Sequence, residues 1–477
     1  QQTTVNANDF DDKGMRGDMR YRSFAVLAMG LCSVQITQAA ETNLGSYGQT
    51  QLQQDTGDSV QRTCIGFVMS GALPGTIPLF DTCSAMVQTA NELSDIGSFD
   101  SSLGLDADEL ADALQQIATE EYTATGTLAN EAAGTRMDPL ISRLTELRSG
   151  ARGFSISGLN INNSQTLVNR PGYPGQGGSA GDPLMDNALS GFATINSGVG
   201  EKDANSSSAA FDYDNYRLTA GIDYRLSENL VFGGALSYNR IDTEFDNTAT
   251  VSGGDLETDG WGGALYGSFY KDRYYLDTMV SYATSDYDMV RNIYIPSNTA
   301  VASINESAKA STDSSDYAFS IGGGYTINQG PISFGPYGRA TYMRVDIDSY
   351  EERGADASGL NFSVDDQEWT SLTSVLGAEF SYAISSQRAV IIPQARLGWV
   401  HQFENDQSEI TASYISDPRN NRFRVLTNEP DRNYFELNLS VSSVLQDGLQ
   451  LFVNYDTLLG LEDLSDHQFT LGGRLEF

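Results

Sequence analysis

The second half of the chain alternates apolar and polar residues with a period of two. From Tyr216 to Leu226, every second residue is apolar, and most residues between them are polar or charged. This is the period of a β-strand whose two faces meet different surroundings. A soluble sheet alternates in the same way, so one strand alone does not identify the fold.

The connections between such segments distinguish the two folds, because short turns alternate with long polar gaps. The short turns lie at 227–229, 271–273, 328–331, 385–388 and 446–448, and the gaps lie near 200–208, 244–256, 296–314, 352–366, 404–431 and 457–466. Five turns plus six gaps give eleven connections, and therefore twelve strands. Short turns on one side and long loops on the other are typical of barrels in a Gram-negative outer membrane, where the turns are periplasmic. We predict an all-β transmembrane barrel of twelve antiparallel strands over residues 189–477.

Within this barrel the facing of each strand follows from the alternation. The apolar face that contains Leu218 and Ile222 predicts contact with lipid. The opposite face predicts four side chains that point into the lumen: Arg217, Thr219, Asp223 and Arg225. The mean hydropathy of −0.32 is compatible with this fold, because only alternate residues of a barrel strand face lipid.

The region before the barrel predicts a small, mostly α-helical unit. Asp106 is a suitable N-cap for a helix whose apolar face contains Leu110, Leu114 and Ile117. A second helix is predicted from Asp138-Pro139, because proline is favoured at the first helical position. Its apolar stripe contains Leu140, Leu144 and Leu147, with Arg148 in the last turn and Gly150 after the end. Residues 41–83 are expected to be irregular.

The N-terminus predicts a targeting signal. Basic residues Arg16, Arg20 and Arg22 precede the apolar run Phe24–Val34, and small residues near Ala39 and Ala40 provide a cleavage site. The predicted division is therefore 1–40 for upstream residues and signal peptide, 41–150 for the helical region, 151–188 for a flexible Gly/Pro-rich linker and 189–477 for the barrel.

Two cysteines remain after the signal peptide. Cys64 and Cys83 predict a disulfide, because exported segments pass through an oxidising periplasm; the alternative is two buried free thiols. The two histidines of the chain, His401 and His467, are far from the cysteines in sequence, so a metal site is not expected. No cofactor is expected either.

Charge excludes one class of partner. The formal net charge is −35, whereas nucleic-acid binding needs basic patches. Acidic residues on the predicted loops, such as Asp242, Glu244 and Asp246, either are solvated or share Ca²⁺ and other divalent ions with lipopolysaccharide.

The last strand alternates up to the final residue of the sequence. Thr470, Gly472, Leu475 and Phe477 resemble the terminal signal that the outer-membrane assembly machinery reads. The partners expected from this fold are outer-membrane lipid and lipopolysaccharide, the barrel assembly machinery and periplasmic chaperones.

Residues 189–477 resemble the autotransporter β-domain of type V secretion. The resemblance is carried by the runs DYDNYRLTAGIDYRLSENLVFGGALSYNRIDTEF (212–245), GGDLETDGWGGALYGSFYKDRYYLDTMVSYATSDYDMVRN (253–292) and LGGRLEF at the end. It implies that a helix occupies the pore after a short N-terminal passenger has been exported, and residues 114–159 are similar to the helical region that precedes such barrels. The candidate pore helix contains Leu140, Arg143, Leu144, Leu147 and Arg148. In this chain 38 residues separate that helix from the first strand, enough to extend about 125 Å.

Two segments of the chain bear on chemistries known from the family, namely hydrolysis by a serine nucleophile and self-cleavage at an Asn-Asn pair. Gly57-Asp58-Ser59-Val60 is similar to a GDS nucleophile motif, but a serine nucleophile needs a base, and no histidine precedes His401. We therefore expect no enzyme activity. The Asn-Asn pair at which some members cut themselves is replaced by Asp138-Pro139, and Asn162-Asn163 lies in the linker.

The function predicted from the sequence is that of a translocation unit that exports or displays a short passenger, with the N-terminal region at the surface or in the pore. Two alternatives remain. One is a solute channel with a periplasmic N-terminal region, and the other is an adhesin that acts through its long loops.

Overall fold

The computed structural model describes residues 43–118, 124, 126, 128, 134, 136–148, 155–156, 159–160, 189–205, 210–247, 253–386, 389–404, 408–427, 429, 431–445 and 449–476. The expected signal peptide, most of the expected linker and Phe477 lie outside these residues.

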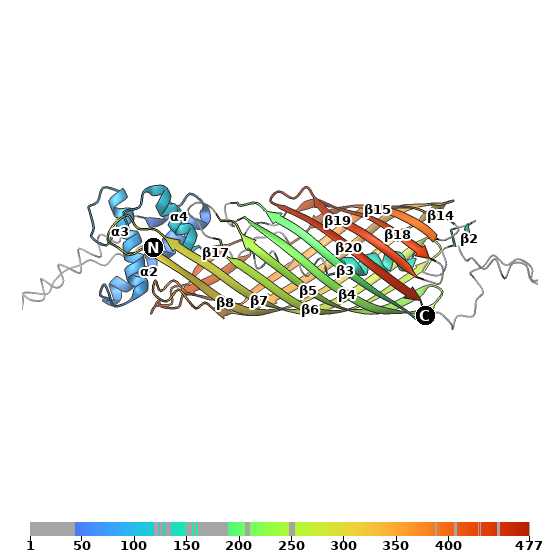
Figure 1. Cartoon of the computed structure of the whole chain (residues 1–477), viewed down its shortest axis with the longest axis horizontal. Coiled ribbons are helices and arrows are strands. Elements are labelled where there is room, and N and C mark those ends of the chain that lie inside the picture. Colours follow the sequence, from blue (N-terminus) through green and yellow to red (C-terminus); the bar gives the residue numbers. More distant parts are fainter. Residues whose placement is uncertain are drawn as a thin grey trace, which may run out of the picture.

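A closed antiparallel barrel forms the main body of the protein (Figure 1). Its strands are β3 (Leu189–Lys202), β4 (Phe211–Ser227), β5 (Leu230–Phe245), β6 (Asp255–Lys271), β7 (Tyr274–Ile295), β8 (Ile304–Tyr325), β10 (Ile332–Ile347), β13 (Gln367–Tyr382), β15 (Ala389–Gln402), β18 (Asn433–Leu445), β19 (Gln450–Leu459) and β20 (Leu464–Glu476). The last strand pairs with the first along Leu464–Glu476, and β13 pairs with β15. Two short strands, β9 (Ile327–Gln329) and β14 (Ile384–Ser385), extend the turn end. Of the 14 strands of this sheet, 12 remain when these two are set aside, which confirms the predicted barrel.

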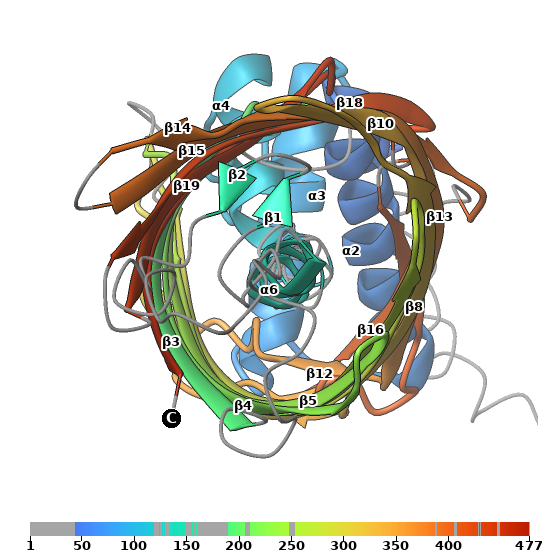
Figure 2. The same ribbon diagram turned by 90° about the vertical axis from the view of Figure 1, so that its right-hand side faces the viewer.

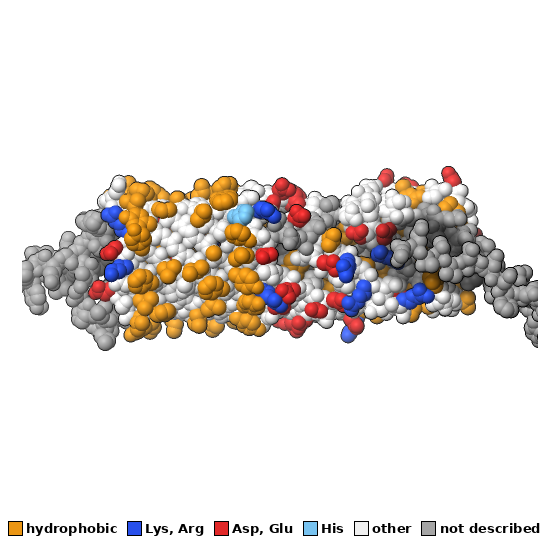
Figure 3. Space-filling view, turned by 180° about the vertical axis from the view of Figure 1, so that it is seen from behind, with side chains coloured by type: hydrophobic (Ala, Val, Ile, Leu, Met, Phe, Trp, Pro, Cys, Tyr) orange, Lys and Arg blue, Asp and Glu red, His pale blue; other side chains and the backbone are white. Residues whose placement is uncertain are grey.

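The outer surface of the barrel carries an apolar belt (Figure 3). Leu218 and Ile222 on β4, and Leu265 on β6, are exposed on this surface, and each alternates with buried neighbours. Beyond the belt, toward the end with the long loops, acidic and basic side chains replace the apolar ones (Figure 3). An apolar band bounded by polar surface is typical of a strand barrel in a bilayer.

Several acidic residues that the sequence placed on loops lie in strands instead. Asp242 is in β5, and Glu257 and Asp259 are in β6. Arg240 forms ion pairs with Asp242 at 2.8 Å and with Glu257 at 3.1 Å. The sheet therefore continues past the apolar belt, where charged residues on its outer face meet water. Within the described part of the chain, no group of three or more His, Cys, Asp or Glu side chains is arranged to hold a metal ion.

Aromatic side chains on the inner wall lie over glycines of neighbouring strands. A Cβ added to Gly233 would lie 2.2 Å from Cζ of Tyr266, and one added to Gly221 would lie 2.4 Å from Cε1 of Phe192. These glycines give the rings space to lie flat against the wall. The lumen thereby keeps room for a second element.

This packing gives a prediction with an adjacent control. Gly233→Ala should destabilise the barrel by about 1–3 kcal/mol, because the new methyl group displaces the Tyr266 ring. Gly234→Ala should have a much smaller effect, since its Cβ would lie 3.4 Å from Leu265 Cδ2 on the outer face. Urea unfolding in lipid vesicles measures both. Equal destabilisation by the two substitutions would contradict the packing account.

The N-terminal region folds into helices, and we call residues 43–118 the helical unit. It contains η1 (Leu44–Tyr47), α2 (Gln51–Ser70), α3 (Pro78–Leu93) and α4 (Ala107–Ile117), and α6 (Asp138–Arg148) follows it. Of the helices in the described residues, none is long and apolar enough to cross a membrane.

The expectation that residues 41–83 are irregular was wrong. Thr50 and Gln53 form a capping box that starts α2, and Gly71 ends this helix with φ +78°. Pro78 occupies the first turn of α3. Small and polar residues make the apolar stripe of α2 weak, and for this reason its period was missed in the sequence. A disulfide joins α2 to α3 between Cys64 and Cys83, with the Cα atoms 5.6 Å apart.

The helical unit lies at the end of the barrel that carries the long loops, opposite the C-terminus (Figure 1). A further sheet lies there, within or beside two of the long polar gaps, and is made of β11 (Tyr350–Glu351), β12 (Phe362–Val364), β16 (Glu409–Tyr414) and β17 (Phe423–Leu426). The long strand β8 supports this sheet through the bridge between Lys309 and Arg353, which follows β11. Burial raises the pKa of Tyr414, which lies in this sheet beside the helical unit.

Candidate translocation pore

Helix α6 lies inside the barrel, and the strands surround it when the molecule is viewed along its long axis (Figure 2). Leu140, Leu144 and Leu147 of the candidate pore helix are buried. Arg148 ends the helix, and its side chain lies outside the described residues. The helix predicted from the Asp138-Pro139 start therefore fills part of the lumen.

A buried ion pair fixes α6 to the wall. Arg143 Nη2 lies 2.5 Å from Asp223 Oδ2, and both side chains are 1% exposed. Ser190 on β3 donates a hydrogen bond to the same carboxylate at 2.8 Å. The guanidinium also lies 5.2 Å from the centre of the Phe192 ring. Removing two charges from water is costly, so such a pair is stable only when hydrogen bonds complete it, as they do here.

A second buried pair lies just before the helix. Both carboxylate oxygens of Asp316 on β8 accept hydrogen bonds from Arg136 Nη1, at 2.5 and 2.7 Å. Asn239 on β5 accepts a longer bond from Arg136 Nη2 at 3.4 Å. The segment that enters the lumen is thus held on β4 through Arg143 and on β8 through Arg136. Arg136 could not be selected from the sequence, because it precedes the helix and has no periodic partner.

The predicted lumen face of β4 points inward. Arg217, Thr219 and Asp223 are buried, and Asp223 contacts α6 through the ion pair. Arg225 lies nearer the turn end and donates a hydrogen bond to the hydroxyl of Tyr270. Alternation along the strand predicted which way these residues face, but it did not predict their partners.

A cavity of about 380 Å³ remains beside α6. Helix residues Asp138 and Ser142 line one side. Charged residues from β10, β15, β18 and β19 line the other side, and these include Arg339, Arg396, Glu436 and Asp456. Arg339 Nη2 contacts Glu436 Oε2 at 2.6 Å. The helix therefore packs on one wall, and polar space remains along the opposite wall.

The described residues of the predicted assembly signal, Thr470, Gly472 and Leu475, lie on β20 where it pairs with β3. Thr470 is buried and accepts a hydrogen bond from Asn196 Nδ2 at 2.9 Å. Gly472 lies under the Phe452 ring, and Leu475 pairs with Gly191 in the ladder. The last strand therefore closes the barrel.

The GDS-like segment lies within α2 instead of a turn. Ser59 is buried in this helix. His401 lies on β15 of the barrel, where Nδ1 is 2.9 Å from Asn433 Oδ1.

A closed barrel with an apolar outer belt and a helix held in its lumen defines an integral outer-membrane protein with an occupied pore. The family model for the autotransporter beta-domain matches residues 191–456, more than half of the 477 residues. The chain belongs to the autotransporter beta-domain family, which confirms the resemblance seen in the sequence.

The chain is 28% identical over 278 residues to esterase EstA of Pseudomonas aeruginosa. This match covers 58% of this chain and 41% of the relative. Esterase EstA of Pseudomonas putida matches to the same extent. The chain thus spans less than half the length of these relatives. Among solved structures, the translocator domain of autotransporter NalP from Neisseria meningitidis is 16% identical with a TM-score of 0.49, covering 73% of this chain and 98% of that one.

The expectation of no enzyme activity is contradicted by these relatives, both of which are named esterases. The expectation rested on the absence of a histidine upstream of His401. A search for a serine-histidine pair considers only a few residues, whereas the relatives are found by similarity along the chain.

Proposed function

We propose that the protein is a translocation unit that displays its own N-terminal helical unit on the outer face of the membrane. One observation carries the proposal, namely that α6 lies in the lumen while the helical unit lies at the loop end. The first strand then begins with Leu189 at the opposite, turn end, where it pairs with Tyr224 and lies beside the C-terminal strand.

The even number of strands supports this assignment. Both ends of the barrel then lie on the side of the short turns, which is periplasmic in barrels of this kind. A segment at the loop end that is joined to the first strand has to pass through the lumen or around the barrel. The buried pairs of Arg136 and Arg143 with wall residues favour the passage through the lumen.

The proposal predicts that protease added to intact cells releases peptides from the helical unit. The expected first site is the exposed tip between α2 and α3, where Leu73 is 66% exposed. Mass spectrometry of the released peptides identifies the site. Peptides from the turn at 271–273 should be released only after the outer membrane is opened. Release of neither set before opening would favour a channel with a periplasmic N-terminal region.

A second candidate function is ester hydrolysis, and the names of the two relatives favour it. The residues that would carry this activity are not identified. The match covers 41% of the relatives, and the one candidate nucleophile considered, Ser59, is buried in a helix. Hydrolysis of p-nitrophenyl butyrate by the purified protein tests it. Activity lost in Ser59→Ala would assign the nucleophile, activity kept in that variant would place it elsewhere, and no activity would reject the candidate.

Assembly follows the same proposal. The barrel assembly machinery would recognise the terminal strand from Thr470 to Phe477, after periplasmic chaperones deliver the unfolded chain. Outer-membrane lipid and lipopolysaccharide would contact the apolar belt and the charged surface above it.

A further inference from the structure

Hydrogen bonds within the barrel protein itself order the loop between β11 and β12. Backbone N–H groups of Ala357 and Ser358 donate to the carboxylate of Glu306, each at 2.9 Å. Asn361 Oδ1 accepts from Ala355 N at 2.9 Å. Gly354 and Gly359 adopt positive φ angles of 113° and 73°, which residues other than glycine rarely adopt. The loop is thus bonded both to β8, which contains Glu306, and within itself. We call residues 350–364 together with β16 and β17 the loop platform.

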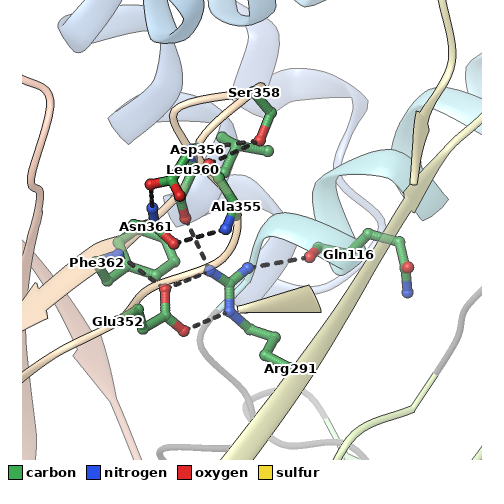
Figure 4. A network of polar contacts seen from close by, with 9 residues as sticks. All are labelled: Gln116, Arg291, Glu352, Ala355, Asp356, Ser358, Leu360, Asn361 and Phe362. Atoms are coloured by element: carbon green, nitrogen blue, oxygen red, sulfur yellow. Dashed lines mark hydrogen bonds and ion pairs between the residues drawn. The ribbon is translucent and has the colours of Figure 1, made fainter. Parts of the chain in front are cut away.

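An arginine from the barrel joins the platform to the wall (Figure 4). Arg291 on β7 donates to both oxygens of Glu352, at 3.0 and 2.7 Å, and both side chains are 2% exposed. Its Nη2 also donates to the carbonyl of Leu360 at 2.9 Å, and its guanidinium lies 4.6 Å from the centre of the Phe362 ring. Glu352 in turn accepts from Phe362 N at 2.8 Å.

The same arginine reaches the helical unit (Figure 4). Its Nη1 donates to the carbonyl of Gln116, near the end of α4, at 3.4 Å. The Gln116 side chain accepts from Tyr294 N on β7 at 2.7 Å. A cation at a helix C-terminus complements the partial negative charge of the last carbonyls. Arg291 therefore contacts the barrel loop and the docked helix at the same time.

Two further places join the unit to the loop end. Thr82 on α3 donates to the carbonyl of Ser358 at 2.9 Å, and a Cβ at Gly359 would lie 2.7 Å from Leu79 N. On the other side, Asn298 N donates to the carbonyl of Leu103 at 2.8 Å. Apolar residues fill the space between these bonds and belong to one continuous core: Val60, Leu79, Met86, Leu360, Phe362 and Tyr414. Contacts at α3, α4 and the segment between them hold the unit in one orientation.

We propose that the loop platform and Arg291 form a built receptor that retains the helical unit on the barrel without the covalent connection through the lumen. Without the helical unit, water could reach Arg291 and Glu352 and solvate both charges. Burying this pair costs free energy, so the burial is not explained by the needs of the loop alone. The docked helix covers the pair and adds an acceptor. A passenger held in this way stays at the barrel when the chain behind it is cut. That the retained unit faces the cell exterior rests on the proposed function; the docking itself does not.

The experiment uses the full chain, purified in detergent, with a flexible insert after Ala118 that carries a site for a specific protease. After cutting is complete, the helical unit should co-elute with the barrel in gel filtration. In Arg291→Ala the unit should dissociate about 100-fold faster, because Glu352 stays buried without its partner. Arg291→Lys should give an intermediate rate, since it keeps the charge but not the two-pronged contact. Arg273→Ala, at the exposed turn end, is the control and should retain the unit.

Uncut chains give a second measurement. Hydrogen exchange followed by mass spectrometry should be faster over 103–117 in Arg291→Ala than in the parent, with unchanged exchange in β4 and β5. Heat-modifiable mobility shows that the barrel has folded. The proposal is overturned if the parent protein loses the unit on cutting, or if Arg291→Ala retains it and exchanges as the parent does. Neither result would affect the proposed function, which the protease experiment on intact cells tests separately.

Discussion

Replacing Arg143 by alanine should open the pore. The substitution leaves Asp223 in the lumen wall with the Ser190 hydroxyl but without its cation, and removing one partner of a buried pair costs about 3–5 kcal/mol. That loss falls on the bound state of α6, so the helix should leave its place far more often. A barrel of this strand number that lacks its helix should conduct ions, because lumens widen with strand number. Single-channel recording in planar bilayers measures the open fraction.

Three further proteins calibrate that measurement. A chain without residues 41–188 gives the conductance of the empty barrel. Arg240→Ala removes an arginine from the outer surface, where its ion pairs are solvent-exposed, and should stay closed. Arg143→Ala combined with Asp223→Asn should recover part of the closed fraction, because the unpaired charge is gone. If Arg143→Ala and the parent conduct alike, the ion pair does not hold a plug.

The second large effect concerns the membrane. Leu218→Arg should destabilise the inserted barrel by about 2–4 kcal/mol, because the side chain faces the apolar belt between Tyr216 and Tyr224 of the same face. Unfolding in lipid vesicles as a function of urea concentration gives the change in free energy. The effect should be much smaller in detergent, where micelles deform around a charge.

The control for this substitution lies on the same strand and the same face. Asp214→Arg is four residues from Leu218 and lies in the charged zone beyond the belt, so its cost should be close to zero. Equal costs at the two positions would mean that the apolar belt is not the membrane-spanning zone.

Residue pattern was sufficient to predict the barrel but not its loops. Alternation and turn spacing define a strand locally, since each residue faces either lipid or lumen. Strands β11, β12, β16 and β17 are two to six residues long, and paired residues lie up to 52 positions apart, as Phe362 and Tyr414 do. No local period marks such strands, because their stability comes from the aromatic cluster of Phe362, Tyr414 and Phe423.

In the candidate site, too, local pattern predicted the elements but not their distant partners. Helical spacing identified Leu140, Leu144 and Leu147, and the family resemblance placed Arg143 on the candidate pore helix. The partner Asp223 was predicted to face inward, but its pairing depends on how the helix is rotated in the barrel, which no local pattern encodes. Arg136–Asp316 and Arg291–Glu352 were missed for this reason, since their members lie 180 and 61 positions apart.

The central claim is that the helical unit and the short turns lie on opposite sides of the membrane. Its most direct test inserts the same epitope in two versions of the full chain, one at Gly75 and one at Asp272. Gly75 lies at the tip between α2 and α3 with open space around it, and Asp272 lies in the turn between β6 and β7. Antibody binding to intact cells should detect the epitope at Gly75, and should detect the one at Asp272 only after permeabilisation. Detection at Asp272 but not at Gly75 in intact cells, or at both only after permeabilisation, would contradict the account.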